Sequence, residues 1–179
     1  SHARLRRSLP QARQRVAAAI SRAAALNEPV LRSRLLMVQA WLWQAQQQTE
    51  HCLSAAAEAL EAARACGYLS GQAQCLNTIA SFESSVATRM RRFQQGLALY
   101  RAGGDLAGQN ILTGNLGNTY VELGLYQRGR RFQIEADDGD RRLGDLGNLL
   151  IGNWNLVDTE FRMGHPAVRQ RVDEAAALT

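Results

Sequence analysis

The acidic run Asp137-Asp138-Gly139-Asp140 is a group of side chains whose type and spacing suit cation binding. Carboxylates are preferred calcium ligands, but this run lacks the twelve-residue ligand pattern and the terminal glutamate of a calcium-binding loop. The sequence therefore predicts no calcium site here. We expect the three acids to lie beside Arg141 and Arg142 at a fraying helix end.

His51, Cys52, Cys66 and Cys75 are residue types that bind zinc. A structural zinc site needs paired ligands two to four residues apart, and these residues are not spaced in that way. We therefore predict no metal site and expect Cys52 to be a small buried residue. Three cysteines without a disulfide framework also favour a reducing compartment, which we expect to be the cytoplasm.

The basic side chains exclude two classes of enzyme chemistry. All 21 basic residues are arginines, and the chain has no lysine. A phosphate-binding P-loop and a Schiff-base catalyst both need a lysine. No nucleophile stands beside a base, and no acidic pair has a known catalytic separation. We predict that this segment is not an enzyme, has no catalytic residues and holds no cofactor, although a longer parent chain is compatible with a catalytic domain elsewhere.

An internal repeat indicates which elements position any site. Gly104-Asp105-Leu106 returns as Gly144-Asp145-Leu146, and Asn115-Leu116 returns as Asn155-Leu156, each offset by 40 positions. A fixed period in the range of about 20–50 residues is typical of repeat arrays. Apolar residues at helical spacing, ended by glycines such as Gly124, predict two helices in each repeat.

These repeats predict an all-α fold, a right-handed α-solenoid of about nine helices forming one domain over residues 1–179. A leading helix over residues 8–26 opens with the capping box Ser8-Leu9-Pro10-Gln11. Four helical hairpins follow, over residues 27–66, 67–103, 104–143 and 144–179. We expect the chain to be a fragment of a larger protein. Solenoids of this kind bind partners along an extended concave face.

The hairpins resemble the tetratricopeptide repeat family. Helix A of that family carries a leucine, a small residue and an aromatic residue, and Leu116, Gly117 and Tyr120 match. Helix B carries small residues seven apart, as Gly129 and Ala136 are. The period near 40, rather than the commoner 34, is similar to a longer-helix subclass. That subclass occurs in bacterial maltose-activator-like regulators and in bacterial sensors joined to nucleotide-cyclase or kinase domains.

The resemblance implies a partner-binding groove lined by helix A of each repeat. It places Asn115 and Asn155 where an amide, which is both donor and acceptor, pairs with the backbone of a bound peptide. The remaining implied groove residues are Asn118, Asp158, Glu122, Arg162, Trp154, Asn77, Thr78, Ser81, Trp41 and Gln44. The alternatives are that the asparagines face solvent or bond between helices, and that Trp154 and Trp41 pack between repeats.

The predicted function is a protein–protein interaction or sensory module of a larger bacterial signalling or transcription-regulating protein. Its partner would be a protein or peptide in the concave groove. One alternative is a small-molecule sensor that controls a linked nucleotide-cyclase or kinase. Another is an arginine-mediated nucleic-acid scaffold, which the net charge of +5 favours. The arginines form small scattered groups rather than one stripe, so we do not expect a nucleic-acid partner.

Two further expectations concern surfaces. No apolar run approaches the roughly 20 residues of a membrane span, so we predict no membrane partner. The leading helix has no upstream partner and carries an apolar stripe of Val16, Ala19, Ile20 and Ala23. Such a stripe is able to pair with a second copy of the chain, and we therefore consider a homodimer formed through terminal helices.

Overall fold

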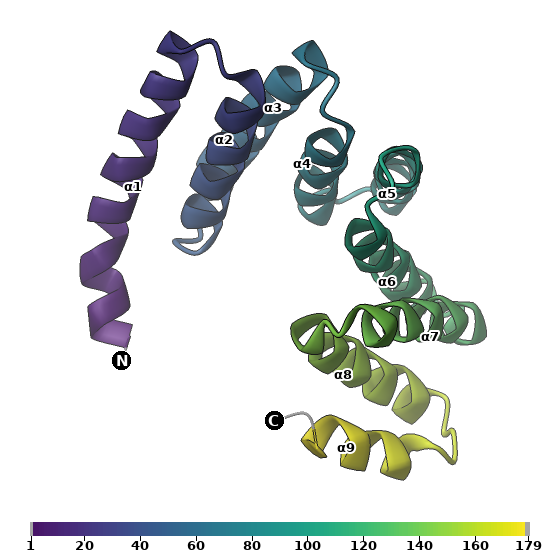
Figure 1. Ribbon diagram of the computed structural model, residues 1–179. Coiled ribbons are helices and arrows are strands. Elements are labelled where there is room, and N and C mark those ends of the chain that lie inside the picture. The colour runs from purple at the N-terminus through teal and green to yellow at the C-terminus, as the bar shows by residue number, and fades with distance from the viewer. Residues whose placement is uncertain (1, 178–179) are drawn as a thin grey trace. The chain divides into compact units, whose positions relative to one another are not determined.

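The computed structural model describes residues 2–177, and over that range every regular element is a helix (Figure 1). The first four are α1 (His2–Ala25), α2 (Pro29–Gln44), α3 (Thr49–Ala65) and α4 (Leu69–Ser81). The other five are α5 (Val86–Ala102), α6 (Leu106–Glu122), α7 (Tyr126–Leu143), α8 (Leu146–Arg162) and α9 (Val168–Ala177). The predicted all-α fold is thus confirmed for the described residues. None of the helices described is both long and apolar enough to cross a lipid bilayer.

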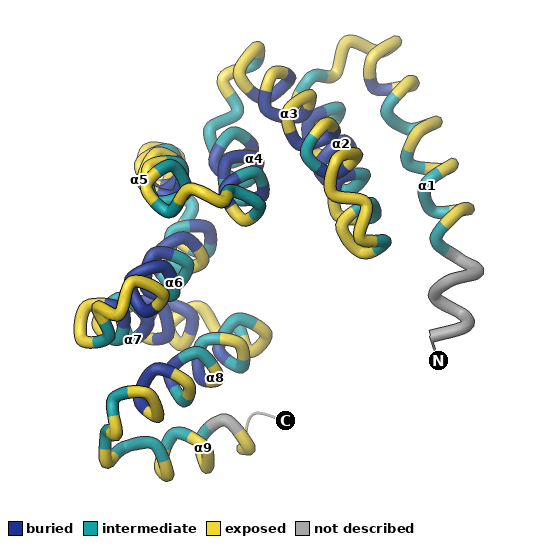
Figure 2. Tube along the Cα trace, turned by 180° about the vertical axis from the view of Figure 1, so that it is seen from behind, coloured by how far each residue is buried: buried dark blue, intermediate teal, exposed yellow. Residues whose placement is uncertain are grey.

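The helices form two compact units, Ser1–Ser84 and Ser85–Thr179. In the first unit α1 packs on α2, α2 on α3 and α3 on α4. In the second unit α5, α6, α7, α8 and α9 pack on one another in the same consecutive manner. Within each unit the buried residues lie on the sides where neighbouring helices meet (Figure 2). Each unit therefore has its own core.

The repeated Gly-Asp-Leu segments are helix boundaries. Gly104 and Gly144 both have φ of +69°, a left-handed conformation that glycine adopts without strain. Asp105 and Asp145 then cap the next helix, because the Oδ1 of each accepts from the backbone N–H three residues later, at 2.9 and 3.0 Å. The repeat in the sequence is therefore a turn that ends one helix and starts the next.

Helices α6 and α7 approach closely where two glycines face each other. A Cβ atom on Gly129 would lie 2.8 Å from the carbonyl oxygen of Gly117 and 2.5 Å from Cγ2 of Val121. A Cβ atom on Gly117 would lie 3.0 Å from the carbonyl oxygen of Gly129. Neither position has room for a side chain, which confirms the predicted small residues at this crossing. The close contact fixes α7 against α6.

The leading helix differs from its prediction in where it starts. Helix α1 already begins at His2, so the predicted start at the Ser8 capping box is wrong. Pro10 lies inside the helix rather than near its end. Proline removes one backbone hydrogen bond there, but the helix-favouring residues on both sides continue the helix through it.

The apolar stripe of α1 is not a free surface. Ala23 is 1% exposed, and Val16, Ala19 and Ile20 are half-buried. Among the described residues, α2 is the helix that packs against α1, so α2 covers the stripe. The stripe is therefore covered in part within the chain, and a homodimer through terminal helices stays a prediction.

Candidate functional site

A small polar cleft lies between α6, α7 and α8 in the second unit, with a volume of about 80 Å³. We call it the α6–α8 cleft. Helix α6 contributes Asn110, Ile111, Gly114, Asn115 and Asn118, and α7 contributes Gln133, Ala136, Asp137 and Asp140. Helix α8 contributes Asn148, Ile151, Gly152 and Asn155. The lining is thus rich in side-chain amides and contains two carboxylates.

Three of the sequence-predicted groove residues come together in this cleft. Asn115, Asn118 and Asn155 all line it, and all three are half-buried. The Oδ1 atom of Asn118 accepts a hydrogen bond of 2.8 Å from Nε2 of Gln133, which orients this amide. That these amides bind a partner stays a prediction.

Asp137 lies at the floor of the cleft. Its side chain is 2% exposed, and its Oδ2 atom is 3.4 Å from Nδ2 of Asn153 and 3.5 Å from an Nη atom of Arg141. The Oδ1 atom is buried and has no hydrogen-bond partner. It occupies space that Gly152 leaves free, because a Cβ atom on Gly152 would lie 2.5 Å from it. The floor therefore holds a carboxylate oxygen that lacks a donor.

Asp140 is the second buried carboxylate of the cleft. Its Oδ1 atom accepts a hydrogen bond of 2.9 Å from Nδ2 of Asn110. Gly139 makes room for this amide, because a Cβ atom on Gly139 would lie 2.2 Å from Oδ1 of Asn110. The amide of α6 is thus held against the carboxylate of α7.

The acidic run was predicted at a fraying helix end, and this prediction is wrong for Asp137 and Asp140. Helix α7 continues to Leu143, so both residues belong to its regular part. Residues three apart share one face of a helix, which turns both carboxylates toward the interior. Asp138 lies on the exposed side, where it pairs with Arg141 at 3.1 Å.

Burial controls the titration of these carboxylates. Burial raises the pKa of Asp137 to about 6, with smaller raising effects from Asp140 and Asp138 and lowering effects from Arg141 and Arg171. Burial also raises the pKa of Asp140, which the hydrogen bond from Asn110 partly offsets. A cation within a few ångströms of such a buried carboxyl group stabilises its ionised form and therefore lowers its pKa.

A second buried carboxylate cluster lies outside the cleft. Glu160 of α8 is 0% exposed, and its Oε1 atom accepts from Nε of Arg130 at 2.8 Å. The Nε atom of Arg171 lies 3.7 Å from the same oxygen. These contacts join α7, α8 and α9 through one carboxylate. Because breaking a buried pair leaves a charge uncompensated, this cluster holds the end of the second unit together.

The other predicted groove residues of the second unit lie outside the α6–α8 cleft. Asp158 and Arg162 form an ion pair of 2.8 Å on the exposed side of α8. Trp154 is on the same helix and is about half exposed. Glu122 pairs with Arg89 of α5 at the surface. These residues form a polar and aromatic surface rather than part of the cleft lining.

The remaining predicted groove residues belong to the first unit. Trp41 and Gln44 are exposed on α2, and Ser81 is exposed at the end of α4. The Ser81 hydroxyl donates to the carbonyl of Asn77 at 3.0 Å. Thr78 is 8% exposed and buried in the core of this unit. Little of Thr78 is therefore accessible to a partner, and its place in a groove stays a prediction.

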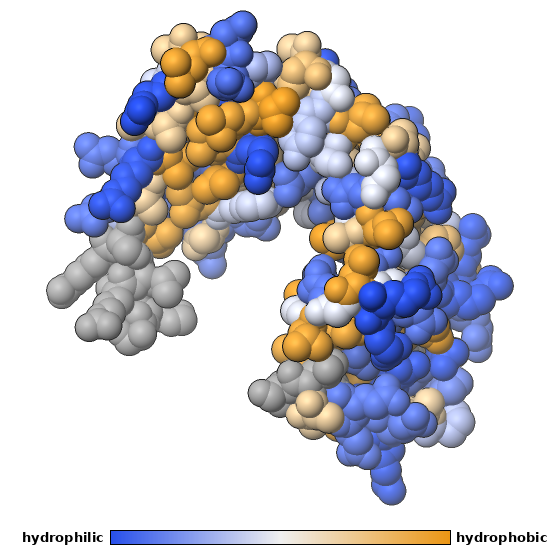
Figure 3. All heavy atoms as spheres, viewed as in Figure 1, coloured by the Kyte–Doolittle hydropathy of each residue, from blue (hydrophilic) through white to orange (hydrophobic). Residues whose placement is uncertain are grey.

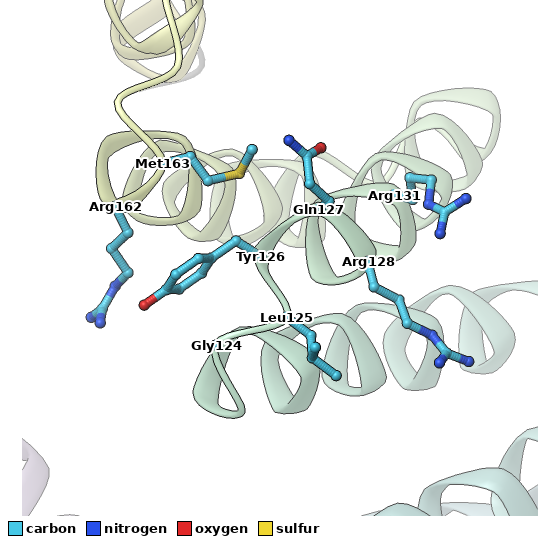
Figure 4. A pocket seen from close by; sticks show the side chains of 8 residues that line it. All are labelled: Gly124, Leu125, Tyr126, Gln127, Arg128, Arg131, Arg162 and Met163. Atoms are coloured by element: carbon cyan, nitrogen blue, oxygen red, sulfur yellow. The ribbon is translucent and has the colours of Figure 1, made fainter.

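A larger hollow of about 640 Å³ lies where the α6–α7 turn meets the end of α8. Its lining includes Arg128, Arg131 and Arg162, but their guanidinium groups point apart (Figure 4). Arg128 lies over the ring of Tyr120, with Cζ 4.3 Å from the ring centroid. An anion site needs donors that converge on one point. This hollow therefore gives no support to phosphate or nucleic-acid binding.

Comparisons with known proteins bear on the fold. No protein-family model and no curated protein sequence matches this chain. The crystal structure of the apo form of RapI is similar, with 16% identity and a TM-score of 0.74, over 97% of this chain and 49% of that chain. The crystal structure of BtubC (BKLC) from P. vanneervenii is also similar, with 14% identity and a TM-score of 0.57, over 96% of this chain and 91% of that chain.

These two likenesses show the fold alone, because both identities are low. They agree with an all-α solenoid of stacked helices, which confirms the predicted fold class. This chain spans about half the length of RapI.

Proposed function

We propose that this chain is a protein-interaction module that binds an extended segment of a partner along the α6–α8 cleft. The observation that carries the proposal is that Asn115, Asn118 and Asn155 line one cleft in half-buried positions. An amide offers a donor and an acceptor together, so a set of amides is able to hold a peptide backbone in register.

The spacing of the amides supports an extended ligand. Asn115 and Asn155 occupy equivalent positions of α6 and α8, one repeat apart. Packed helices lie about 8–10 Å apart. At roughly 3.3 Å per residue, that distance corresponds to about three residues of an extended chain. Equivalent amides on successive repeats would therefore meet equivalent backbone groups of the ligand.

The setting that we propose follows the tetratricopeptide resemblance. Residues 1–179 would act as one long-period repeat domain of a larger bacterial signalling or transcription-regulating protein. The free cysteines, of which Cys52 and Cys75 are buried, agree with a reducing cytoplasm. The domain would bind a regulatory protein or peptide and pass that event to an output domain elsewhere in its parent chain.

The size of the α6–α8 cleft argues against a small molecule enclosed in it, whereas the hollow of about 640 Å³ at the α6–α7 turn has the size of a small-molecule site. Sites for drug-sized ligands have volumes of about 300–1,000 Å³, and the α6–α8 cleft has about 80 Å³. A metabolite would not be enclosed there. The cleft suits the backbone and single side chains of a longer ligand.

The test is a peptide array of degenerate nonamers probed with the protein and with the double variant Asn115→Ala/Asn155→Ala. Loss of two backbone-pairing amides should weaken binding at least about tenfold, which corresponds to about 1.4 kcal/mol. The matched control is Gln94→Ala/Gln95→Ala, which removes two exposed amides of α5 in the same unit. Equal binding by all three proteins would contradict the proposal.

A further inference from the structure

We propose that the α6–α8 cleft selects partners with an arginine, whose guanidinium group binds over Asp137 and Asp140. This inference rests on the proposed function and adds the chemistry of the ligand to it. It follows from three properties of the cleft: an excess of acceptors, an uncompensated negative charge and small residues along its walls.

The floor of the cleft has acceptors without donors. Oδ1 of Asp137 and Oε1 of Gln133 are both buried and have no hydrogen-bond partner among the described residues. They lie one helical turn apart on α7, and both side chains are more than nine-tenths buried. Buried acceptors of this kind normally have partners. A ligand that brings donors to the cleft would satisfy these acceptors.

Three neighbouring amides already donate a hydrogen bond to other groups. Nδ2 of Asn110 donates to Asp140, and Nε2 of Gln133 donates to Asn118. Nδ2 of Asn148 donates to Asp145 at 2.9 Å. No described residue donates to Oδ1 of Asp137 or Oε1 of Gln133, and a guanidinium group carries five N–H donors in a planar fork that matches a carboxylate.

The charge of the floor is not balanced by a buried cation. The guanidinium of Arg141 is about half exposed. It lies 3.5 Å from Oδ2 of Asp137, and no contact with Oδ1 of Asp137 is present. Arg171 of α9 pairs with Glu174 at 2.9 Å and lies beside Glu160. Helix α6 brings no ionisable side chain to the cleft. Low-dielectric walls around two carboxylates concentrate a negative potential, which attracts a cation.

The walls of the cleft fit an arginine side chain. Gly114 of α6 and Gly152 of α8 line the cleft without side chains. Ile111 and Ile151 stand at equivalent positions of α6 and α8, and both are exposed at the cleft. Apolar side chains at a rim can cover the aliphatic stem of an arginine while its head reaches polar groups.

The experiment compares two pools of blocked, degenerate nonapeptides at pH 7.5 and low salt. One pool has arginine at its central position and the other has citrulline, which is nearly the same shape but uncharged. Fluorescence anisotropy should show at least tenfold tighter binding of the arginine pool. Asp137→Asn should reduce this preference to about twofold or less. A thermal melt followed by circular dichroism checks that this variant is folded.

Asp138→Asn is the matched control, because it removes the same charge from the exposed side of the same helix. It should keep the arginine preference. If Asp137→Asn and Asp138→Asn reduce the preference for the arginine pool equally, the cause is a long-range field effect, and the proposed subsite is overturned. Tight binding of N-acetyl-arginine amide, equal to that of the peptides, would indicate a small guanidino compound and would also overturn it.

The outcomes separate this inference from the proposed function. Equal binding of the two pools, still abolished by Asn115→Ala/Asn155→Ala, would overturn the arginine subsite and leave the peptide-binding function in place. If the unmodified protein binds neither pool more tightly than the double variant does, both the arginine subsite and the peptide-binding function are overturned.

Discussion

The interiors of the two units are built from different chemistry. The first unit buries apolar residues, many of them alanines, and its only described buried polar side chains are Ser33 and Thr78. The second unit buries several ionisable or amide side chains, namely Gln133, Asp137, Asp140, Asn153 and Glu160. On the face seen in Figure 3, hydrophobic side chains gather over α2 and α3, whereas the surface of the second unit is mostly hydrophilic.

The contrast suggests that the two units have different tasks. Alanines such as Ala56, Ala59 and Ala63 let α3 pack closely, and the buried hydroxyl of Ser33 has its partner there in the carbonyl of Ala59. Buried carboxylates, by contrast, lower stability unless each of them is paired. A unit that keeps such groups, two of them with an oxygen that has no hydrogen-bond partner among the described residues, has the composition of a binding site. This comparison is our reason for proposing the binding site in the second unit.

The largest expected effect concerns the ion pairs of the two units. Glu160→Ala removes a fully buried carboxylate, which takes from Arg130 its partner at 2.8 Å and leaves Arg171 with Glu174 alone. We expect a loss of about 3–5 kcal/mol in the free energy of unfolding. Urea unfolding followed by circular dichroism measures it.

The control for this prediction lies in the first unit. Glu61 and Arg64 form a pair of 2.8 Å in which both side chains are mostly exposed. Glu61→Ala should cost no more than about 0.5 kcal/mol, because solvent screens such a pair. A cost below about 1 kcal/mol for Glu160→Ala would remove the proposed difference between the two interiors.

A smaller effect of opposite sign is expected at Asp137. The folded chain holds the proton of this residue up to a pKa of about 6, against an ordinary value of 3.8. The stability that the group contributes is therefore fully present below about pH 4 and is lost as the pH rises through about 6. Asparagine resembles the protonated acid, so Asp137→Asn should raise stability at pH 7.5 by about 2 kcal/mol.

The pH profile tests the cause of this effect. The gain from Asp137→Asn should disappear at pH 4, where the native residue is itself neutral. Asp138→Asn should change stability by no more than about 0.5 kcal/mol at either pH, because that side chain is exposed. A gain that does not depend on pH would show that packing, rather than the buried charge, is responsible.

The residues of the turns between helices made the fold predictable from the sequence. Gly104-Asp105 and Gly144-Asp145 combine a residue that tolerates positive φ with a side chain that caps the next helix, so their repetition fixed the helix boundaries. The same 40-residue register brought Asn115 and Asn155 to equivalent positions in one cleft. Rules for single turns and helix caps were sufficient to predict these boundaries, because the interactions that form them are between residues close in the sequence.

The floor of the cleft was missed because its residues oppose the usual rule that charged side chains face solvent. Ala136 was correctly identified as an interior position, and it is buried. Gln133 lies three residues before Ala136, and Asp137 and Asp140 lie one and four residues after it, on the same helical face. That spacing was the available signal. Gly139 and Gly152, which make room for the polar groups, have partners far away in the sequence and reveal this only in the folded chain.

The side-chain amide resonances of the protein provide the most direct test of the central claim. A titration with an arginine-containing peptide from the array, followed by ¹⁵N–¹H correlation spectra, reports on each asparagine separately. We predict that the amides of Asn115, Asn118 and Asn155 shift while that of Asn77, in the first unit, does not. Saturable binding that shifts Asn77 and the indole resonance of Trp41, and leaves the three cleft amides unchanged, would contradict the account.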